Sequence, residues 1–530
     1  MATIVLSAAG MALGGSVLGL SMATLGRAAG ATLGRVIDQR LLGGGSEPVE
    51  TGRIDRFRLT GASEGAAIGK VYGRMRVAGQ VIWATKFNEA VATSGGGKGA
   101  GPTAATTEFS YSVSLAIALC EGDITHVGRI WADGVEIARA DLNMRVYSGS
   151  QTQSPDPKIV AVEGTKHVPA YRGTAYVVFE DLPLAQFGNR VPQFTFEVMH
   201  PSEEAASAGT SDIARLVKGV ALIPGTGEYS LATTPVHLSA SFGESIAINV
   251  NSPSGGTDLT ASLDSLEGEM ANCKSSVLVV SWFGDDLRCG DCDIAPKVEQ
   301  TEIDAEIMPW RVCGQGRAGA SVVPQLEDRP VYGGTPADAS VVEAIQDMNS
   351  RGIDAVFYPF VLMEQMVGNS LPDPWTGDTG QPTLPWRGRI TTSLAPEQAG
   401  SVDGSAAAEA EVAAFMGSAA VSDFSVQDGV VSYSGPSEWR YRRFILHYAH
   451  LCAAAGGVAG FCIGSEMRGL TQIRGAGGSF PAVAALKTIA AEVRAILGPD
   501  CKIGYAADWS EYHGYQPVGT ADKLFHLDPL

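Results

Sequence analysis

The sequence predicts a multidomain α+β protein that ends in a parallel (β/α) barrel domain. Three observations support this: no residue before Arg27 is charged, short β-branched runs separated by turns follow, and strand and helix patterns alternate toward the C-terminus. We expect an apolar, Gly/Ala-rich helical segment over residues 1–45, a β-rich domain over 46–203, a connecting segment over 204–256 and the barrel over 257–530.

Length, composition and charge limit the classes of function. With 530 residues, 18% of them charged and 65 of them glycine, the chain is a loop-rich globular protein with room for several domains. Its net charge is −19, and Lys and Arg form no cluster. Tight nonspecific binding of nucleic acid needs such a cluster and is therefore excluded. An acidic channel wall that repels a DNA duplex is compatible with this charge.

The N-terminal segment is apolar and rich in small residues. It is long enough to span a membrane, which takes about 20 apolar residues, but it lacks the positive start of a secretory signal. Gly10, Gly14 and their neighbours recur near helical spacing, which lets helices approach closely. We favour a buried structural helix inside an assembly over a membrane anchor. Either interpretation predicts self-association, because a free monomer would expose this surface to water.

The middle of the chain has the pattern of β-strands. Alternating or β-branched runs separated by turn residues occur at 68–77, 79–87, 108–119, 126–132, 174–179 and 193–199. No combination of residues typical of a catalytic site occurs there.

The C-terminal half alternates strand and helix patterns, as a parallel sheet or barrel requires. The expected strands are 276–286, 355–362, 458–463 and 501–507, and the expected helices are 335–348, 437–455 and 481–497. A full barrel has eight strands, whereas about four or five are recognisable here. Residues 526–530 have the pattern of another strand, so we expect a barrel that is incomplete at residue 530.

Glu466 is the most prominent candidate for a catalytic residue. It follows the apolar run 458–463, and (β/α) barrel enzymes place their chemistry at the carboxyl ends of such strands. Glycoside hydrolysis needs two carboxyl groups. Glu511 and Asp508 in the loop after the next strand are candidate partners.

Other interpretations of the same positions stay open. Asp285 or Asp286 is an alternative second acid. We favour the interpretation of Glu466 as a non-catalytic acid paired with Arg468 or Arg387.

Aromatic residues follow the predicted strands, and sugars bind to such aromatic faces. The candidate glycan contacts are Trp282, Trp386, Trp509 and Tyr512. Burial at a subunit contact would explain them equally well.

The cysteines offer only a weak metal site. Cys289 and Cys292 form a C-x-x-C pair, but Cys273 and Cys313 lie at irregular spacings and no histidine flanks the group. Free thiols or one loop disulfide explain the pair better, so we expect no metal and no cofactor.

Several phrases resemble known families. The stretches at 68–83, 110–124, 129–134 and 190–198 resemble the hub region of tail-tip proteins of long-tailed bacteriophages: IGKVYGRMRVAGQVIW, SYSVSLAIALCEGDI, RIWADG and RVPQFTFEV. The stretches at 281–286, 386–390, 461–467 and 505–514 resemble the glycoside-hydrolase-like TIM-barrel domain of the large baseplate proteins of gene transfer agents, which are phage-derived particles: SWFGDD, WRGRI, FCIGSEM and YAADWSEYHG.

The resemblance implies a role at the tail tip of a virion-like particle that is assembled in the bacterial cytoplasm and released. In such families the hub modules form a ring around the tail channel, so the implied partners are two further copies in a trimer, other tail and baseplate proteins, and DNA that passes without specific binding. Contact with cell-surface polysaccharide, and with membrane through the N-terminus, is also implied. In related glycosidase barrels the acid/base glutamate ends the fourth strand, and Glu466 occupies the matching place.

Two functions follow from this resemblance. The first is a structural baseplate component that contacts the cell envelope during DNA delivery, and whose barrel is inactive. The alternative is a tail-borne glycoside hydrolase that acts on cell-wall or capsular polysaccharide.

Overall fold

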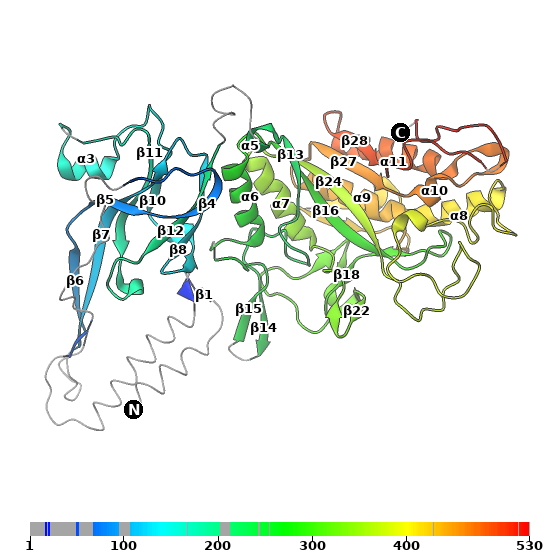
Figure 1. The fold of residues 1–530 in the computed structure, drawn as a ribbon. Helices are drawn as coiled ribbons and strands as arrows, with labels where there is room; N and C mark the ends of the chain where they lie inside the picture. The colour runs from blue at the N-terminus through cyan, green and yellow to red at the C-terminus, as the bar shows by residue number, and fades with distance from the viewer. Residues whose placement is uncertain are drawn as a thin grey trace, which may run out of the picture. The chain divides into compact units, whose positions relative to one another are not determined.

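The computed structural model describes residues 16–17, 20–21, 49–51, 67–94, 106–166, 168–201, 213–241, 244–253, 255–427, 429–517 and 519–528. The chain divides into two compact units, both of which mix helices and strands (Figure 1). Unit 1 comprises Met1–Leu216, Ser252–Gly256 and Asp264–Asn272. Unit 2 comprises Val217–Asn251, Thr257–Leu263 and Cys273–Leu530.

Unit 1 contains two larger β-sheets. The first has the spatial order β10 (Met144–Tyr147), β11 (Thr174–Pro183), β7 (Thr106–Glu121) and β3 (Val49–Thr51), and β7 also pairs with β5 (Gln80–Ala84) and β6 (Asn88–Ser94). The second has the order β4 (Gly73–Ala78), β12 (Phe194–His200), β8 (His126–Ala132) and β9 (Val135–Ile137). A short helix, α3 (Pro157–Glu163), begins after Asp156, whose side chain accepts two backbone N–H groups of its first turn.

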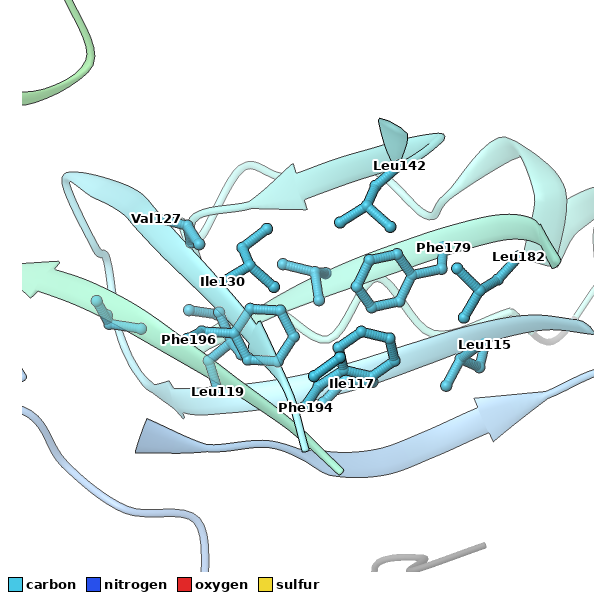
Figure 2. Packing of buried hydrophobic residues seen from close by; sticks show 14 of the residues in the cluster. Leu115, Ile117, Leu119, Val127, Ile130, Leu142, Phe179, Leu182, Phe194 and Phe196 are labelled. Atoms are coloured by element: carbon cyan, nitrogen blue, oxygen red, sulfur yellow. The ribbon is translucent and has the colours of Figure 1, made fainter. Parts of the chain in front are cut away.

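Side chains from both sheets share one hydrophobic core. Leu115 and Ile117 of β7 and Phe179 of β11 belong to the same buried cluster as Phe194 and Phe196 of β12 (Figure 2). The rings of Phe179 and Phe194 stack with centroids 4.7 Å apart. The other face of β7 and β11 is buried as well, because Ala116, Tyr176 and Val178 belong to a second buried cluster. Long apolar runs therefore mark these two central strands in the sequence.

The expected N-terminal helix is wrong at the positions that the structure describes. Most of the segment 1–45 lies outside the described residues. Within it, β1 (Ser16–Val17) pairs with β2 (Leu20–Ser21) as antiparallel strands. Each glycine in a helix interior costs about 1 kcal/mol relative to alanine, and the sequence has glycine at positions 14, 15 and 19. In the described part of the chain, no helix is long and apolar enough to cross a membrane.

Unit 2 is organised around a parallel sheet. Its five parallel strands lie side by side in chain order: β13 (Gly219–Leu222), β16 (Ser275–Gly284), β24 (Asp354–Met363), β27 (Gly460–Ser465) and β28 (Lys502–Ala506). A short strand, β17 (Ile294–Ala295), pairs antiparallel with β16. Sequential parallel order is the arrangement of a (β/α) barrel.

Helices connect the parallel strands. They are α6 (Asp258–Glu269), α7 (Asp338–Ser350), α8 (Ala406–Met416), α9 (Tyr441–Ala454), α10 (Arg468–Thr471) and α11 (Pro481–Leu497). The short α5 (Ile213–Leu216) precedes β13. Alternate residues of β16 are buried, and Trp282 among them lies against α9, with its ring centroid 4.9 Å from that of Phe444.

Short pairings occupy the loops of unit 2. They are β14 (His237–Ser241) with β15 (Glu244–Ala247), β18 (Lys297–Val298) with β21 (Ser321–Val322), β19 (Arg311–Val312) with β20 (Gln315–Gly316), β22 (Gln325–Leu326) with β23 (Arg329–Pro330), and β25 (Phe424–Gln427) with β26 (Val430–Tyr433).

Most of the expected strands and helices of this half are present, with four differences. Residues 526–528 form a turn and not the expected strand. Helix α7 begins at Asp338 and not at residue 335, because the N-cap Ala337 has a ψ of 142°, outside the helical region. Helix α9 begins at Tyr441 and not at residue 437, because residues 437–440 have extended or irregular backbone that ends in the β-region N-cap Arg440. The segment 217–251, expected as a connection, belongs to unit 2 and contributes β13 to the sheet.

Candidate functional site

Acidic residues gather after the carboxyl ends of four parallel strands. Asp285 follows β16, Glu364 follows β24, Glu466 follows β27, and Asp508 lies two residues beyond β28. Parallel strands in one sheet end at the same edge, where (β/α) barrels carry their active sites. This edge of the sheet is therefore the candidate site.

Glu466 is held in place by its backbone and by its carboxylate. Its φ of +49° is unusual for a non-glycine residue, and its N–H donates to the carbonyl of Ala506 over 2.8 Å. Its Oε2 accepts from Trp386 Nε1 at 3.0 Å and from Arg387 Nη2 at 2.6 Å. No described residue donates a hydrogen bond to Oε1. One carboxylate oxygen is thus hydrogen-bonded, and the side chain as a whole is 35% exposed.

Arg387 is the buried partner of Glu466. Its side chain is 6% exposed, its Nε donates to the carbonyl of Ser465 at 2.9 Å, and its Nη2 also reaches Ser465 Oγ at 2.9 Å. The guanidinium carbon lies 3.7 Å from the centre of the Phe360 ring. Burial lowers the pKa of Arg387, and the charge of Glu466 opposes that shift. Arg387, and not Arg468, is therefore the ion-pair partner, one of the two considered from the sequence.

Glu511 is buried, and both oxygens of its carboxylate accept hydrogen bonds. It is 2% exposed, and it accepts from Thr471 Oγ1 at 2.9 Å, Tyr505 Oη at 3.0 Å and the Asp508 N–H at 2.8 Å. Desolvation by burial raises the pKa of Glu511. The hydroxyl of Tyr505 also accepts from the N–H of Met467 at 2.7 Å, so Glu511 supports the turn that carries Glu466.

Asp508 has a local partner. Its Oδ1 accepts the N–H of Ser510 at 2.9 Å, and hydrogen bonds from Ser510 lower the pKa of Asp508.

The two acids after β16 differ in environment. Asp286 is 3% exposed and accepts from Arg288 Nη2 at 2.6 Å and from Gln381 Nε2 at 2.7 Å, which marks it as structural. Asp285 accepts the N–H of Asp293 at 2.8 Å. Desolvation, together with the charges of nearby acids, raises the pKa of Asp285 to about 6.

The four candidate aromatic residues are not equivalent. Trp282 is fully buried, and its indole N–H donates to Tyr448 Oη at 2.9 Å, so it cannot meet a glycan from solution. Its position as the last of the alternating buried residues in a strand accounts for this. Trp386 is 37% exposed beside Glu466, and Trp509 and Tyr512 are 75% and 71% exposed on the loop after β28.

The cysteine pair is buried and lacks further ligands. Burial raises the pKa of both Cys289 and Cys292, which disfavours the thiolates that a metal binds. Among the described residues, no group of three or more His, Cys, Asp or Glu side chains is placed to hold a metal ion.

Two members of the site were missed in the sequence. Lys297 at the start of β18 forms an ion pair with Glu364, which follows β24 and is 67 positions later in the chain. No local pattern pairs them, because the contact depends on the adjacency of β16 and β24 in the sheet.

Comparison with models of known protein families gives a match for the C-terminal part of unit 2. Residues 439–530, which include β27, Glu466 and β28, match the family model of the GTA TIM-barrel-like domain. This stretch of the chain is therefore similar to that family. The resemblance to gene transfer agent proteins expected from the sequence is confirmed.

Two solved structures were compared with this chain. A chain from the virion of a native gene transfer agent (GTA) particle is 58% identical, covering 39% of this chain and 43% of that chain with a TM-score of 0.26. This chain therefore spans less than half of the length of that virion protein. A GH113 β-1,4-mannanase is 11% identical, covering 55% of this chain and 54% of that chain with a TM-score of 0.23. No curated protein matches the sequence.

Proposed function

We propose that the protein is a structural baseplate component at the tail tip of a gene transfer agent particle. The observation that carries this proposal is the match of residues 439–530 to the GTA TIM-barrel-like domain. The proposed molecule surrounds the tail channel as a trimer with other tail proteins and contacts the cell envelope while DNA passes through. Its net charge of −19 fits a wall that DNA does not bind.

The geometry of the acids supports an architectural barrel. A glycosidase needs two carboxyl groups that both face the sugar. Glu511 is buried with hydrogen bonds to both of its oxygens, and Asp286 is buried beside Arg288. Arg387 and Trp386 hold one oxygen of Glu466. These contacts stabilise the loops at the edge of the sheet.

Particle composition tests the proposal. A tagged copy of the gene in the producing bacterium should give particles that carry the protein at a fixed ratio, with the tag located at the tail end by electron microscopy. Particles made without the gene should fail to adsorb to cells and to transfer DNA. A protein found only outside particles, or normal transfer by particles that lack it, would sink the proposal.

A glycoside hydrolase is the second candidate, favoured by one observation. Oε1 of Glu466 receives no hydrogen bond from the described residues and lies on a side chain beside the half-exposed Trp386. Purified peptidoglycan and capsular polysaccharide should be incubated with the wild-type protein and with Glu466→Gln. Release of reducing ends by the wild type alone would establish the enzyme, whereas no release by either protein favours the structural role.

A further inference from the structure

The second sheet of unit 1 has two open edges. Its order is β4–β12–β8–β9 and each neighbouring pair is antiparallel, so β4 and β9 run in opposite directions. Among the described residues, β12 is the only strand that pairs with β4, and β8 is the only one that pairs with β9. The N–H and C=O groups of an edge strand can pair with another chain. A second copy that brings its β9 beside β4 would therefore continue the antiparallel ladder.

One face of this sheet is apolar from edge to edge. Cross-strand partners lie on the same face. On this face the partners run from β4 to β9 as Val77, Phe196, Ile130 and Ile137. The face belongs to the hydrophobic core of unit 1, so a strand added at either edge would extend that core.

This apolar face ends in a hollow at one edge and in an exposed side chain at the other. The hollow beside β4 has a volume of about 220 Å³, and Ile68, Met75 and Val77 are among the residues that line it. Met75 is 51% exposed. At the opposite edge, Val135 of β9 is 68% exposed. In a continued sheet, Val135 of one copy would cover the hollow of the next, and both apolar surfaces would leave water.

The other face carries a cation at one edge and an anion at the opposite edge. Arg76 of β4 donates to Thr195 Oγ1 at 2.8 Å, and its guanidinium carbon lies 4.1 Å from the centre of the Trp131 ring. Glu136 of β9 is the cross-strand partner of Trp131 and therefore shares this face. Neither Arg76 nor Glu136 forms an ion pair with a residue that the structure describes. The two edges are thus complementary in charge.

We propose that copies of this chain associate edge to edge through this sheet, with β9 of one copy added antiparallel to β4 of the next. The register that places Glu136 opposite Arg76 also places Val135 opposite Val77. Opposite charges then meet on one face and apolar side chains on the other. The inference rests on the proposed function, because a ring around the tail channel needs an interface between its copies.

Pairing of like edges is disfavoured. Two β4 strands side by side would bring Arg74 and Arg76 of one copy close to the same arginines of the other, and two β9 strands would oppose their Glu136 side chains. Like charges at such positions destabilise a strand pair. Pairing of unlike edges is heterologous, and it leaves no free edge once the copies close into a ring.

Exchange of the two charges tests the pairing in particles from the producing bacterium. Arg76→Glu and Glu136→Arg each place like charges side by side, so each variant should enter particles about tenfold less than the wild type. The double variant exchanges the two charges and should return to near the wild-type level. Lys86→Glu is the matched control, because Lys86 is an exposed cation between β5 and β6 and lies outside this sheet. It should enter particles as the wild type does.

The outcomes separate this inference from the proposed function. Wild-type levels of both single variants in particles, or a double variant that stays low, would overturn the pairing and leave the proposed function in place. Absence of the wild-type protein from particles would overturn the proposed function and the inference that rests on it. Urea unfolding of the purified variants distinguishes a loss of pairing from a loss of fold.

Cross-linking identifies the paired edges without a change of charge. A chain with both Met75→Cys and Val135→Cys, treated in intact particles with a short bismaleimide, should give covalent dimers and larger species. Either cysteine alone should leave the chains unlinked. Dimers from Met75→Cys alone would show that two β4 edges meet, and unlinked chains from the double variant would likewise overturn the inference.

Discussion

Arg387 and Glu466 form an ion pair, 2.6 Å long, in which the cation is buried and the anion is partly exposed. The guanidinium also donates to the carbonyl of Ser465 and stacks on Phe360. The end of β27 is therefore held by a residue that comes from a loop about 80 positions earlier in the chain. This contact joins the quoted phrases around residues 386 and 466 into one site.

Arg387→Lys should destabilise unit 2. An ammonium cannot reach the carboxylate and the Ser465 carbonyl at once, and it stacks poorly on Phe360. We expect a loss of about 1–3 kcal/mol, at the lower end because Glu466 keeps some access to water. Urea unfolding at neutral pH measures the loss. Arg468→Lys is the matched control, because Arg468 is an exposed arginine of the same edge, and an equal loss in both variants would contradict the assignment.

The substitution Gly469→Ala should disturb the contact between α10 and residues 388–390, close to the Arg387–Glu466 ion pair. A Cβ at this position would lie 2.6 Å from the carbonyl oxygen of Ile390 and 2.9 Å from that of Gly388, and neither backbone atom can move freely. Overpacking of this kind costs about 1–3 kcal/mol. Thermal unfolding should show the loss. Gly504→Ala in β28 is the control, because a Cβ there meets nothing within 4 Å, and a comparable loss from that change would refute the steric explanation.

Several helices and strands of unit 2 were predictable because each has a pattern of apolar residues, or of residues that start and end a helix, within its own stretch of sequence. Helix α11 has an apolar residue on one face at each turn, Pro481 at its start and Gly498 after its end, and it spans the predicted residues 481–497. Strands β16 and β24 are long apolar runs and agree with prediction to within about two residues. Strand β13 was missed because its four residues, Gly219–Leu222, are too few to show a period.

The site was predictable only in part. The position of Glu466 follows from a strand followed by an acid, which is a local pattern. The burial of Trp282 and Glu511 depends on which face of a strand or loop meets a helix, and that is decided by packing. The hydrogen bond between Asp338 and His447 joins residues 109 positions apart, and no local sequence pattern predicts it.

Stability of unit 1 should fall in acid because of Glu197. Hydrogen bonds from Arg74, assisted by Arg129, lower the pKa of Glu197 to about 2. A depressed carboxyl pKa stabilises the fold above the unfolded value of about 4.3, and this stability is lost as the pH falls toward 2. The two arginines are more than half exposed, so we expect a loss of about 1–2 kcal/mol and not the full linkage value.

Urea unfolding of unit 1 at several pH values between about 5 and 2.5 checks this expectation. The control is Glu197→Gln, which should be less stable at neutral pH and should show a shallower decline in acid. An unchanged pH dependence in this variant would show that other carboxyl groups cause the decline.

The hairpin between β22 and β23 should be improved by a different turn sequence. Leu326 pairs with Arg329, so Glu327 and Asp328 form the loop, and both have positive φ, at +52° and +58°. Such a turn favours Asn-Gly. Glu327→Asn combined with Asp328→Gly should stabilise unit 2 by about 0.5–1 kcal/mol, because relief of the left-handed strain exceeds the entropy cost of the new glycine.

The hairpin between β8 and β9 supplies the reciprocal test. There Asp133 and Gly134 already form the loop with φ of +50° and +86°, and a Cβ on Gly134 would meet nothing within 4 Å. Gly134→Asp should therefore cost unit 1 about 1 kcal/mol through backbone strain alone. Urea midpoints measured for both changes should move in opposite directions. A loss of stability in the first hairpin would mean that contacts of Glu327 or Asp328, and not backbone strain, determine the stability of that turn.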